Sequence, residues 1–267
     1  MRIRIVDAFT DRPFTGNPAG VVLLDGGAFP PDSWMQRVAA EVGASETCFA
    51  HPLDDGADWA LRWFTPACEV DLCGHGTLAT THVIAPSAPV SYRTRGGILT
   101  AIPRADGAYT LDFPVARLTP APVPAEAKEA IGAEPVRAYA CRGGIRDLLL
   151  ELSDEQAVRS VAPDLAAVAR LAPYGLIVTA AAKDPAAGYD FVSRLFDPAQ
   201  GIDEDPVTGS AHTALAPLWS ARLGRDELTG LQASARSGLV GTKLRGERVE
   251  LTGRAVTVID GELLARP

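Results

Sequence analysis

Two short stretches of this chain repeat each other and decide the fold. Residues 62–67 read Arg-Trp-Phe-Thr-Pro-Ala and residues 194–199 read Arg-Leu-Phe-Asp-Pro-Ala, at an offset of 132. Residues 69–75 then read Glu-Val-Asp-Leu-Cys-Gly-His and residues 204–210 read Glu-Asp-Pro-Val-Thr-Gly-Ser, at an offset of 135. The matched order and the near-equal offsets indicate an internal duplication.

Each copy predicts the same local structure: a strand, a proline-containing loop, a glycine turn and a helix. The helical stretches are the apolar residues 77–84 and 212–218. Short β-branched or alternating runs bounded by Gly, Pro or Asp predict many strands, and one central helix per half predicts an α+β (mixed α/β) fold. The predicted strands are 3–9, 21–24, 47–50, 59–64, 91–94, 98–102, 109–113, 146–152, 176–179, 191–196, 231–235, 242–245, 248–251 and 255–259, and further helices are 31–42, 125–131 and 163–171.

A proline-rich stretch separates the two copies. Residues 114–124 hold four prolines, so they favour neither a helix nor a central strand, and we interpret them as a linker. The predicted domains are therefore residues 1–113 and 114–254, the second being a repeat of the first.

Composition excludes several classes of function. The 267 residues are 47% hydrophobic and 22% charged, as in an ordinary globular protein, and the apolar runs are too short to span a membrane. A net charge of −8 argues against a nucleic-acid partner. Four cysteines do not form a secreted disulfide pattern, and the N-terminal residues 1–9 lack a signal-peptide core. We therefore expect a cytoplasmic protein.

The duplicated glycine turns are the first candidate site. Gly74 and Gly209 each stand at the mouth of a predicted helix, where free backbone N–H groups favour an anion. Two such helix starts facing one cleft create a site that prefers a carboxylate and stabilises an enolate-like charge. Capping of a tight turn is the alternative interpretation of each turn taken singly.

The spacing of the cysteines and histidines does not predict a metal site. Cys73 and His75 form a Cys-x-His pair without partners at the usual ligand spacing, so we expect no metal. A hydrolase is also disfavoured, because no Gly-x-Ser-x-Gly nucleophile motif is present.

Two carboxylates are candidates for a group that transfers a proton. Glu46 begins an otherwise apolar strand, and Asp205 precedes the second glycine turn. A carboxylate in a dehydrated cleft is suited to general acid/base catalysis. On position alone, a solvent-facing Glu46 and a turn-capping Asp205 are the favoured interpretations.

Together these strings resemble a known family. Phe-Thr-Gly-Asn-Pro-Ala-Gly at 14–20, Ser-Glu-Thr at 45–47, Phe-Thr-Pro at 64–66, Leu-Cys-Gly-His at 72–75 and Glu-Asp-Pro-Val-Thr-Gly-Ser-Ala-His at 204–212 resemble the PhzF-like (phenazine biosynthesis) family. The resemblance implies a diaminopimelate epimerase-like fold: two pseudo-symmetric domains, each a sheet curled around a central helix, with the active site between them. It also implies that about residues 255–267 complete the first domain, and that the protein is a homodimer.

The resemblance further implies roles for individual residues. Glu46 corresponds to the glutamate that moves a proton within a dihydro-hydroxyanthranilate without metal or organic cofactor. His75 and Asp205 would hydrogen-bond the substrate or relay a proton. The binding of the substrate's carboxylate is assigned to the residues around the helix starts: Cys73, Gly74, Thr208, Gly209 and Ser210.

The repeat also tests a rival function. Diaminopimelate epimerases and proline racemases resemble this chain around Cys-Gly but use one cysteine from each half. Here Cys73 has Thr208 as its counterpart at the offset of 135, and threonine is far too weak an acid for that role. We therefore predict a cofactor-independent isomerase acting on a small cyclic or amino carboxylate. The alternatives are an amino-acid or hydroxy-acid racemase, epimerase or dehydratase, and a non-catalytic small-molecule binding protein.

Overall fold

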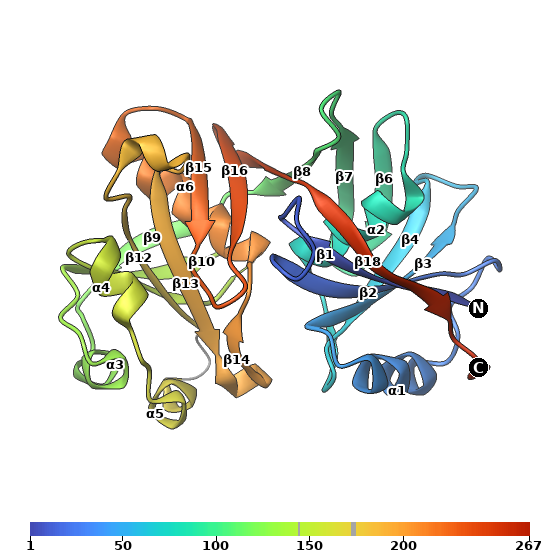
Figure 1. Ribbon diagram of the computed structural model, residues 1–267, viewed down its shortest axis with the longest axis horizontal. Helices are drawn as coiled ribbons and strands as arrows, with labels where there is room; N and C mark the ends of the chain where they lie inside the picture. Colours follow the sequence, from blue (N-terminus) through green and yellow to red (C-terminus); the bar gives the residue numbers. More distant parts are fainter. Residues whose placement is uncertain (144, 172–174) are drawn as a thin grey trace. The chain divides into compact units, whose positions relative to one another are not determined.

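The computed structural model describes residues 1–143, 145–171 and 175–267 and has a mixed α/β fold, as the sequence predicts (Figure 1). Contacts divide the chain into two compact units. Unit 1 consists of Met1–Asp112 together with Thr252–Pro267, and unit 2 is Phe113–Leu251. Among the described residues, no helix combines the length and the apolar character needed to cross a membrane.

Unit 1 is a mainly antiparallel sheet with two helices of eleven residues. The helices are α1 (Asp32–Val42) and α2 (Gly74–Ile84). The strands are β1 (Arg2–Ala8), β2 (Asn17–Leu23), β3 (Glu46–Pro52), β4 (Trp59–Phe64), β5 (Glu69–Val70), β6 (Val90–Thr94), β7 (Gly97–Pro103), β8 (Tyr109–Pro114) and β18 (Ala255–Glu262).

Unit 2 contains one long helix and several short ones. The helices are α3 (Ala125–Ile131), α4 (Glu155–Ser160), α5 (Leu165–Arg170) and α6 (Gly209–Leu223), with 3-10 turns η1 (Pro185–Ala187) and η2 (Pro198–Gln200). The strands are β9 (Arg117–Ala121), β10 (Arg137–Arg142), β11 (Leu148–Glu151), β12 (Leu176–Ala181), β13 (Phe191–Asp197), β14 (Ile202–Asp205), β15 (Glu227–Gln232), β16 (Gly238–Arg245) and β17 (Arg248–Gly253).

The two units pair their strands in the same pattern. In unit 1 the order is β18–β1–β2–β3–β4–β6–β7, with β2/β3 and β4/β6 parallel. In unit 2 the order is β9–β10–β11–β12–β13–β15–β16, with β11/β12 and β13/β15 parallel. The short strands β5 and β14 pair with β4 and β13 respectively. The duplication in the sequence is therefore a duplication of topology.

Each sheet contacts a central helix that is buried over most of its length. In α2 the first eight residues are buried, and the helix packs against β1, β2, β3, β7 and β18. In α6 ten of the fifteen residues are buried, and the helix packs against β9, β15 and β16. Small and apolar side chains on all faces let a helix occupy such a position, which fixes the direction of its N-terminus.

The repeated arginine of the two strings has the same structural role in each unit. Arg62 in β4 makes a two-pronged ion pair with Glu69 of β5, with both N···O distances 2.7 Å. Arg194 in β13 does the same with Glu204 of β14, at 2.7 and 3.0 Å. Each guanidinium also lies over the ring of the phenylalanine two residues further along. These ion pairs dock a short strand directly before each glycine turn.

The linker prediction for residues 114–124 is wrong. Pro114 ends β8, and β9 places Pro120 opposite Tyr139 of β10. An edge strand tolerates proline because the missing N–H faces away from the ladder. The boundaries between the units follow Asp112 and Leu251, one and three residues from the predicted positions, and Thr252–Pro267 lies in unit 1.

Candidate functional site

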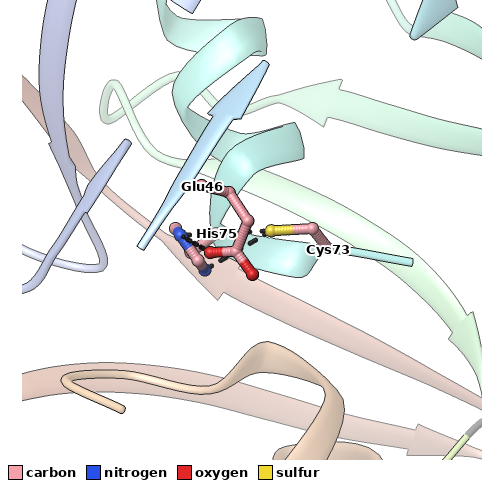
Figure 2. Close-up of side chains that lie close together, drawn as sticks. All are labelled: Glu46, Cys73 and His75. Atoms are coloured by element: carbon pink, nitrogen blue, oxygen red, sulfur yellow. Dashed lines mark hydrogen bonds and ion pairs between the residues drawn. The ribbon is translucent and has the colours of Figure 1, made fainter. Parts of the chain in front are cut away.

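The fold of unit 1 brings together three of the residues singled out in the sequence. Glu46 begins β3, Cys73 is the N-cap of α2, and His75 lies in the first turn of that helix (Figure 2). The Nε2 atom of His75 is 2.9 Å from Oε2 of Glu46, and its Nδ1 atom is 3.5 Å from Sγ of Cys73. Their exposed fractions are 8% for Glu46, 5% for Cys73 and 3% for His75, so the contact is shielded from water.

A residue that the sequence analysis did not assign to the site fixes the ring of His75. When the ring is neutral, the Nδ2 atom of Asn17 donates to Nδ1 of His75 at 3.2 Å, and the ring proton is then on Nε2, the nitrogen 2.9 Å from Glu46. Asn17 is fully buried at the start of β2, which pairs in parallel with β3. Its place in the Gly-Asn-Pro-Ala-Gly string was the available signal.

Burial and charge shift the pKa values of this group. Burial alone would lower the pKa of His75, but Cys73 and Glu46 outweigh it and hold this pKa well above its usual value. Burial, reinforced by the Glu46 carboxylate, raises the pKa of Cys73 to about 12. The thiol is therefore uncharged near neutral pH.

Gly76 is required for the close packing of this site. Its N–H donates to Sγ of Cys73 at 3.3 Å. A Cβ atom at this position would lie 2.8 Å from Sγ of Cys48, 2.9 Å from Cδ1 of Trp63 and 3.0 Å from Sγ of Cys73. A side chain here would collide with these atoms, including the thiol that caps the helix. The requirement for glycine at the second position of the Gly-His-Gly string is therefore steric.

The duplicated glycine turns occupy equivalent positions. Gly74 is the first residue of α2 and Gly209 the first residue of α6, and both are buried. Their neighbours Cys73 and Thr208 are the two N-cap residues. Each unit thus presents the N-terminus of its central helix at the residues where the sequence predicts anion binding.

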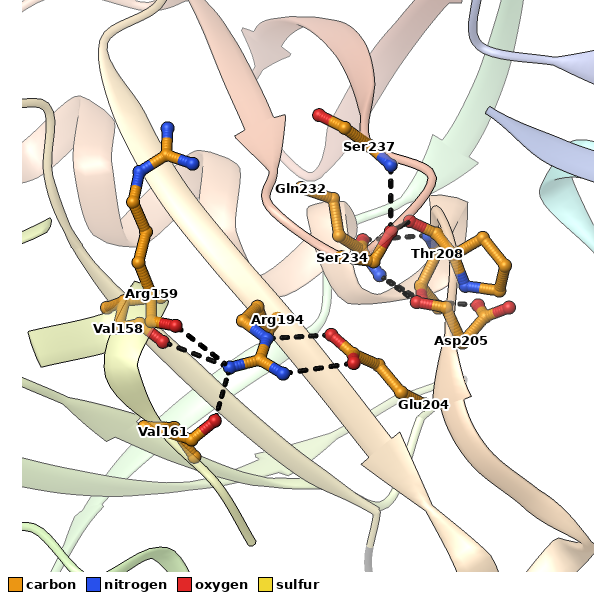
Figure 3. Close-up of polar contacts among 11 residues, drawn as sticks. Val158, Arg159, Val161, Arg194, Glu204, Asp205, Thr208, Gln232, Ser234 and Ser237 are labelled. Carbon is orange, nitrogen blue, oxygen red and sulfur yellow. Dashed lines mark hydrogen bonds and ion pairs between the residues drawn. The ribbon is translucent and has the colours of Figure 1, made fainter. Parts of the chain in front are cut away.

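In unit 2 a buried glutamine organises residues 205–208 (Figure 3). The Thr208 hydroxyl donates a short hydrogen bond to Oδ2 of Asp205. Gln232 of β15 accepts from the Thr208 N–H at 2.8 Å, and donates to the Asp205 carbonyl at 2.7 Å and to the Thr208 hydroxyl at 3.0 Å. Asp205 is 6% exposed and Gln232 only 1%. The sequence analysis missed Gln232, which carries no motif signal.

The remaining candidate of unit 2 is Ser210, in the first turn of α6. Its side chain is partly buried, and its carbonyl accepts from the Thr213 hydroxyl at 2.7 Å. Nearby, the Nδ1–H of His212 donates to the Thr208 carbonyl at 2.8 Å. Burial lowers the pKa of His212 to about 4, so this ring is neutral near pH 7 and serves as a structural support for Thr208.

The three side chains in unit 1 also form a potential ligand set. Among the described residues, one group of three or more potential metal ligands occurs: Glu46, Cys73 and His75, whose donor atoms all lie within 4.8 Å of one another. Sequence spacing could not reveal it, because the carboxylate comes from β3, far along the chain from the Cys-x-His pair.

A separate surface hollow of about 450 Å³ lies in unit 2 and contains none of the predicted site residues. Its lining includes Asp154 and Glu155 at the start of α4, and Lys183 after β12. The Glu155 carboxylate is already bound by Arg159 and Tyr189. The Glu155 carboxylate is therefore already engaged, and we do not take the hollow as the candidate site.

Comparison with known proteins decides the family. A family model described as phenazine biosynthesis-like protein, PhzC-PhzF, matches residues 6–261. The chain belongs to the PhzC-PhzF family. A family relative in Halalkalibacterium halodurans, named an uncharacterised isomerase, is 44% identical over 269 residues, covering 98% of each chain. The predicted enzyme class, an isomerase of the PhzF-like family, is thereby confirmed.

Solved structures confirm the fold. A PhzF-family phenazine biosynthesis protein of Enterococcus faecalis is 38% identical, covers 99% of both chains and superimposes with a TM-score of 0.90. A hydroxyproline epimerase from Agrobacterium vitis is only 16% identical, yet has a TM-score of 0.66 over 98% of this chain and 90% of its own. The PhzF chain therefore shares the architecture of the epimerases, as the sequence predicts.

Proposed function

We propose that this protein is an isomerase that moves a proton within a small carboxylate-bearing substrate, with Glu46 as the general acid/base and with no organic cofactor. The observation that carries the proposal is the buried 2.9 Å contact between Glu46 and His75 at the start of α2. A shielded carboxylate held by an imidazole is suited to taking up and returning one proton.

Each partner has a separate task in this proposal. Asn17 fixes the ring of His75, and His75 holds one oxygen of the Glu46 carboxylate. The second oxygen points away from the imidazole (Figure 2). In the proposed reaction that oxygen abstracts an acidic proton alpha, or vinylogous, to a carbonyl or imine, and returns it on the same face.

We assign binding of the substrate's carboxylate to the starts of the central helices. The N-terminal amides of α2 at Gly74, beside Cys73, offer donors and a favourable dipole. The start of α6, with Thr208, Gly209 and Ser210, offers the same in unit 2. Asp205 is proposed to hydrogen-bond the substrate or relay a proton. A dihydro-hydroxyanthranilate or another cyclic or amino carboxylate fits this chemistry.

The rival two-thiol racemase is less well supported. Its second thiol would stand at Thr208, and the first, Cys73, has a pKa raised to about 12 and is a poor base near neutral pH. One-base chemistry by Glu46 needs neither thiol. This is why isomerisation is preferred here over racemisation.

Substitution of Glu46 by glutamine tests the proposal. The purified protein is incubated with dihydro-hydroxyanthranilate, and then with a panel of cyclic and amino carboxylates, in D₂O, and conversion is followed by proton NMR. We expect Glu46→Gln to reduce turnover by about 10² to 10⁴-fold, the usual contribution of a positioned acid/base, with substrate binding retained. Glu41→Gln on the exposed face of α1 is the matched control.

The outcomes separate the candidate functions. Unchanged turnover in Glu46→Gln on a substrate that the wild type converts would exclude Glu46 as the base. Deuterium at an amino acid's alpha carbon that requires Cys73 but not Glu46 would favour a racemase. Binding across the panel without any exchange of substrate protons would support a non-catalytic binding protein.

We also propose a cytoplasmic homodimer. Light scattering on the purified chain measures the oligomeric state, and fractionation of the native cells measures the location. A mass corresponding to one chain at micromolar concentration would remove the dimer from the proposal.

A further inference from the structure

The buried cluster in unit 1 has the composition of a zinc site. It combines a carboxylate, a thiol and an imidazole, the three side-chain types that bind Zn²⁺ in proteins. All three side chains come from unit 1, two of them from the start of α2 and one from the start of β3. The site is therefore complete within one unit.

The distances are close to those that zinc requires. Zinc bonds of about 2.0 to 2.3 Å place the donors of a tetrahedral site roughly 3.3 to 3.6 Å apart. Here Nε2 of His75 is 2.9 Å from Oε2 of Glu46 and 4.0 Å from Sγ of Cys73. All donor atoms lie within 4.8 Å of one another.

The neighbouring groups are those that support metal ligands. The Gly76 N–H, directed at Sγ of Cys73 at 3.3 Å, would stabilise the thiolate that forms when a cation displaces the thiol proton. Asn17 holds the Nδ1 side of the His75 ring. If this amide turned by half a turn, its oxygen would accept a hydrogen bond from the Nδ1–H of His75. Nε2 would then be free for a metal, the usual arrangement around a zinc-bound histidine.

We propose that Glu46, Cys73 and His75 form an inhibitory site for a borderline-soft divalent cation of the Zn²⁺ class. Three protein ligands leave a fourth position open to water. The bound cation occupies the carboxylate and the imidazole, so it blocks proton transfer by Glu46. The binding stands independently, whereas the inhibition rests on the function proposed above.

Direct metal binding tests the site without any substrate. The whole protein is titrated with Zn²⁺ against a fluorescent chelator, and with Co²⁺, whose thiolate complexes absorb by charge transfer. We expect one metal per chain and a cobalt–thiolate band. Both should be lost in Cys73→Ser, with zinc affinity falling by more than about 100-fold, since even supporting residues around a metal contribute 10 to 100-fold.

The chain offers a matched control and a second variant. Cys68→Ser removes the exposed cysteine of the same unit and should leave the affinity and the band unchanged. Serine is also a good N-cap, so Cys73→Ser should retain α2, as circular dichroism can verify. Glu46→Gln, which keeps the shape of the side chain, should weaken zinc binding while preserving the cobalt–thiolate band.

The results distinguish failure of the site from failure of the function. Absence of stoichiometric binding, or equal affinity in wild type and Cys73→Ser, overturns the zinc site. Tight binding lost in Cys73→Ser supports it even if no substrate is converted. Where turnover is measurable, Zn²⁺ should abolish it and EDTA restore it. Full turnover with the site occupied would overturn the inhibitory role.

Discussion

Replacing Gln232 by leucine tests how much of the unit 2 site depends on one buried side chain. Leucine has a similar size but makes none of the three hydrogen bonds of Gln232 to residues 205–208. The Thr208 N–H and the Asp205 carbonyl would lose these partners in a buried position. At about 1 kcal/mol for each bond, we expect the free energy of unfolding to fall by about 3 kcal/mol.

Chemical denaturation of wild type and Gln232→Leu measures this loss, provided that the free energy of unfolding depends on denaturant concentration with the same slope in both proteins. Gln156→Leu is the control, because Gln156 is an exposed glutamine of the same unit whose side chain donates to Ser160. Hydrogen exchange adds a local readout, and the Thr208 amide should exchange much faster in Gln232→Leu. Equal stability together with unchanged protection of that amide would refute the proposed support of residues 205–208.

Three further predictions concern stability. The pKa of His212 is lowered to about 4 in the folded chain, against 6.5 in the unfolded chain, so between these pH values the unfolded chain binds the extra proton. The free energy of unfolding should therefore fall by about 3 kcal/mol as the pH drops from 6.5 to 4. Calorimetry should show that the stability of His212→Gln depends less on pH over this range. Gly76→Ala forces a Cβ against Sγ of Cys48 and should cost about 1 to 3 kcal/mol in urea denaturation; an unchanged midpoint contradicts the packing argument. Arg194→Met breaks the two-pronged bond to Glu204 and should cost about 2 kcal/mol, part of which Arg194→Met combined with Glu204→Leu should recover; no recovery contradicts ion-pair stabilisation.

Sequence patterns located the central helices and most strands because those elements bury continuous apolar runs. They missed β5 and β14, which are two and four residues long and rich in acidic side chains. Those strands exist because Arg62 and Arg194 dock their glutamates, a tertiary interaction that no local propensity reports. They also missed α4, β9 and β10, and placed β15 four residues too late.

The candidate site was predictable only in its parts. The family strings identified Glu46 and His75 singly, but their contact depends on the start of β3 lying beside the start of α2, which the sheet register sets. Asn17 and Gln232 act through hydrogen bonds from neighbouring strands, and an amide side chain has no spacing rule that would reveal such a role.

The pairing of β18 with β1 has a consequence for biosynthesis. The two strands pair along Arg2–Ala8, so β1 receives this neighbour from a strand that the ribosome makes only after the whole of unit 2 (Figure 1). Unit 2 is one continuous segment and can finish its sheet earlier. Domains usually fold in order of synthesis, N-terminal first. Here unit 1 cannot complete its sheet until unit 2 has been translated, so β1 lacks its β18 neighbour until then.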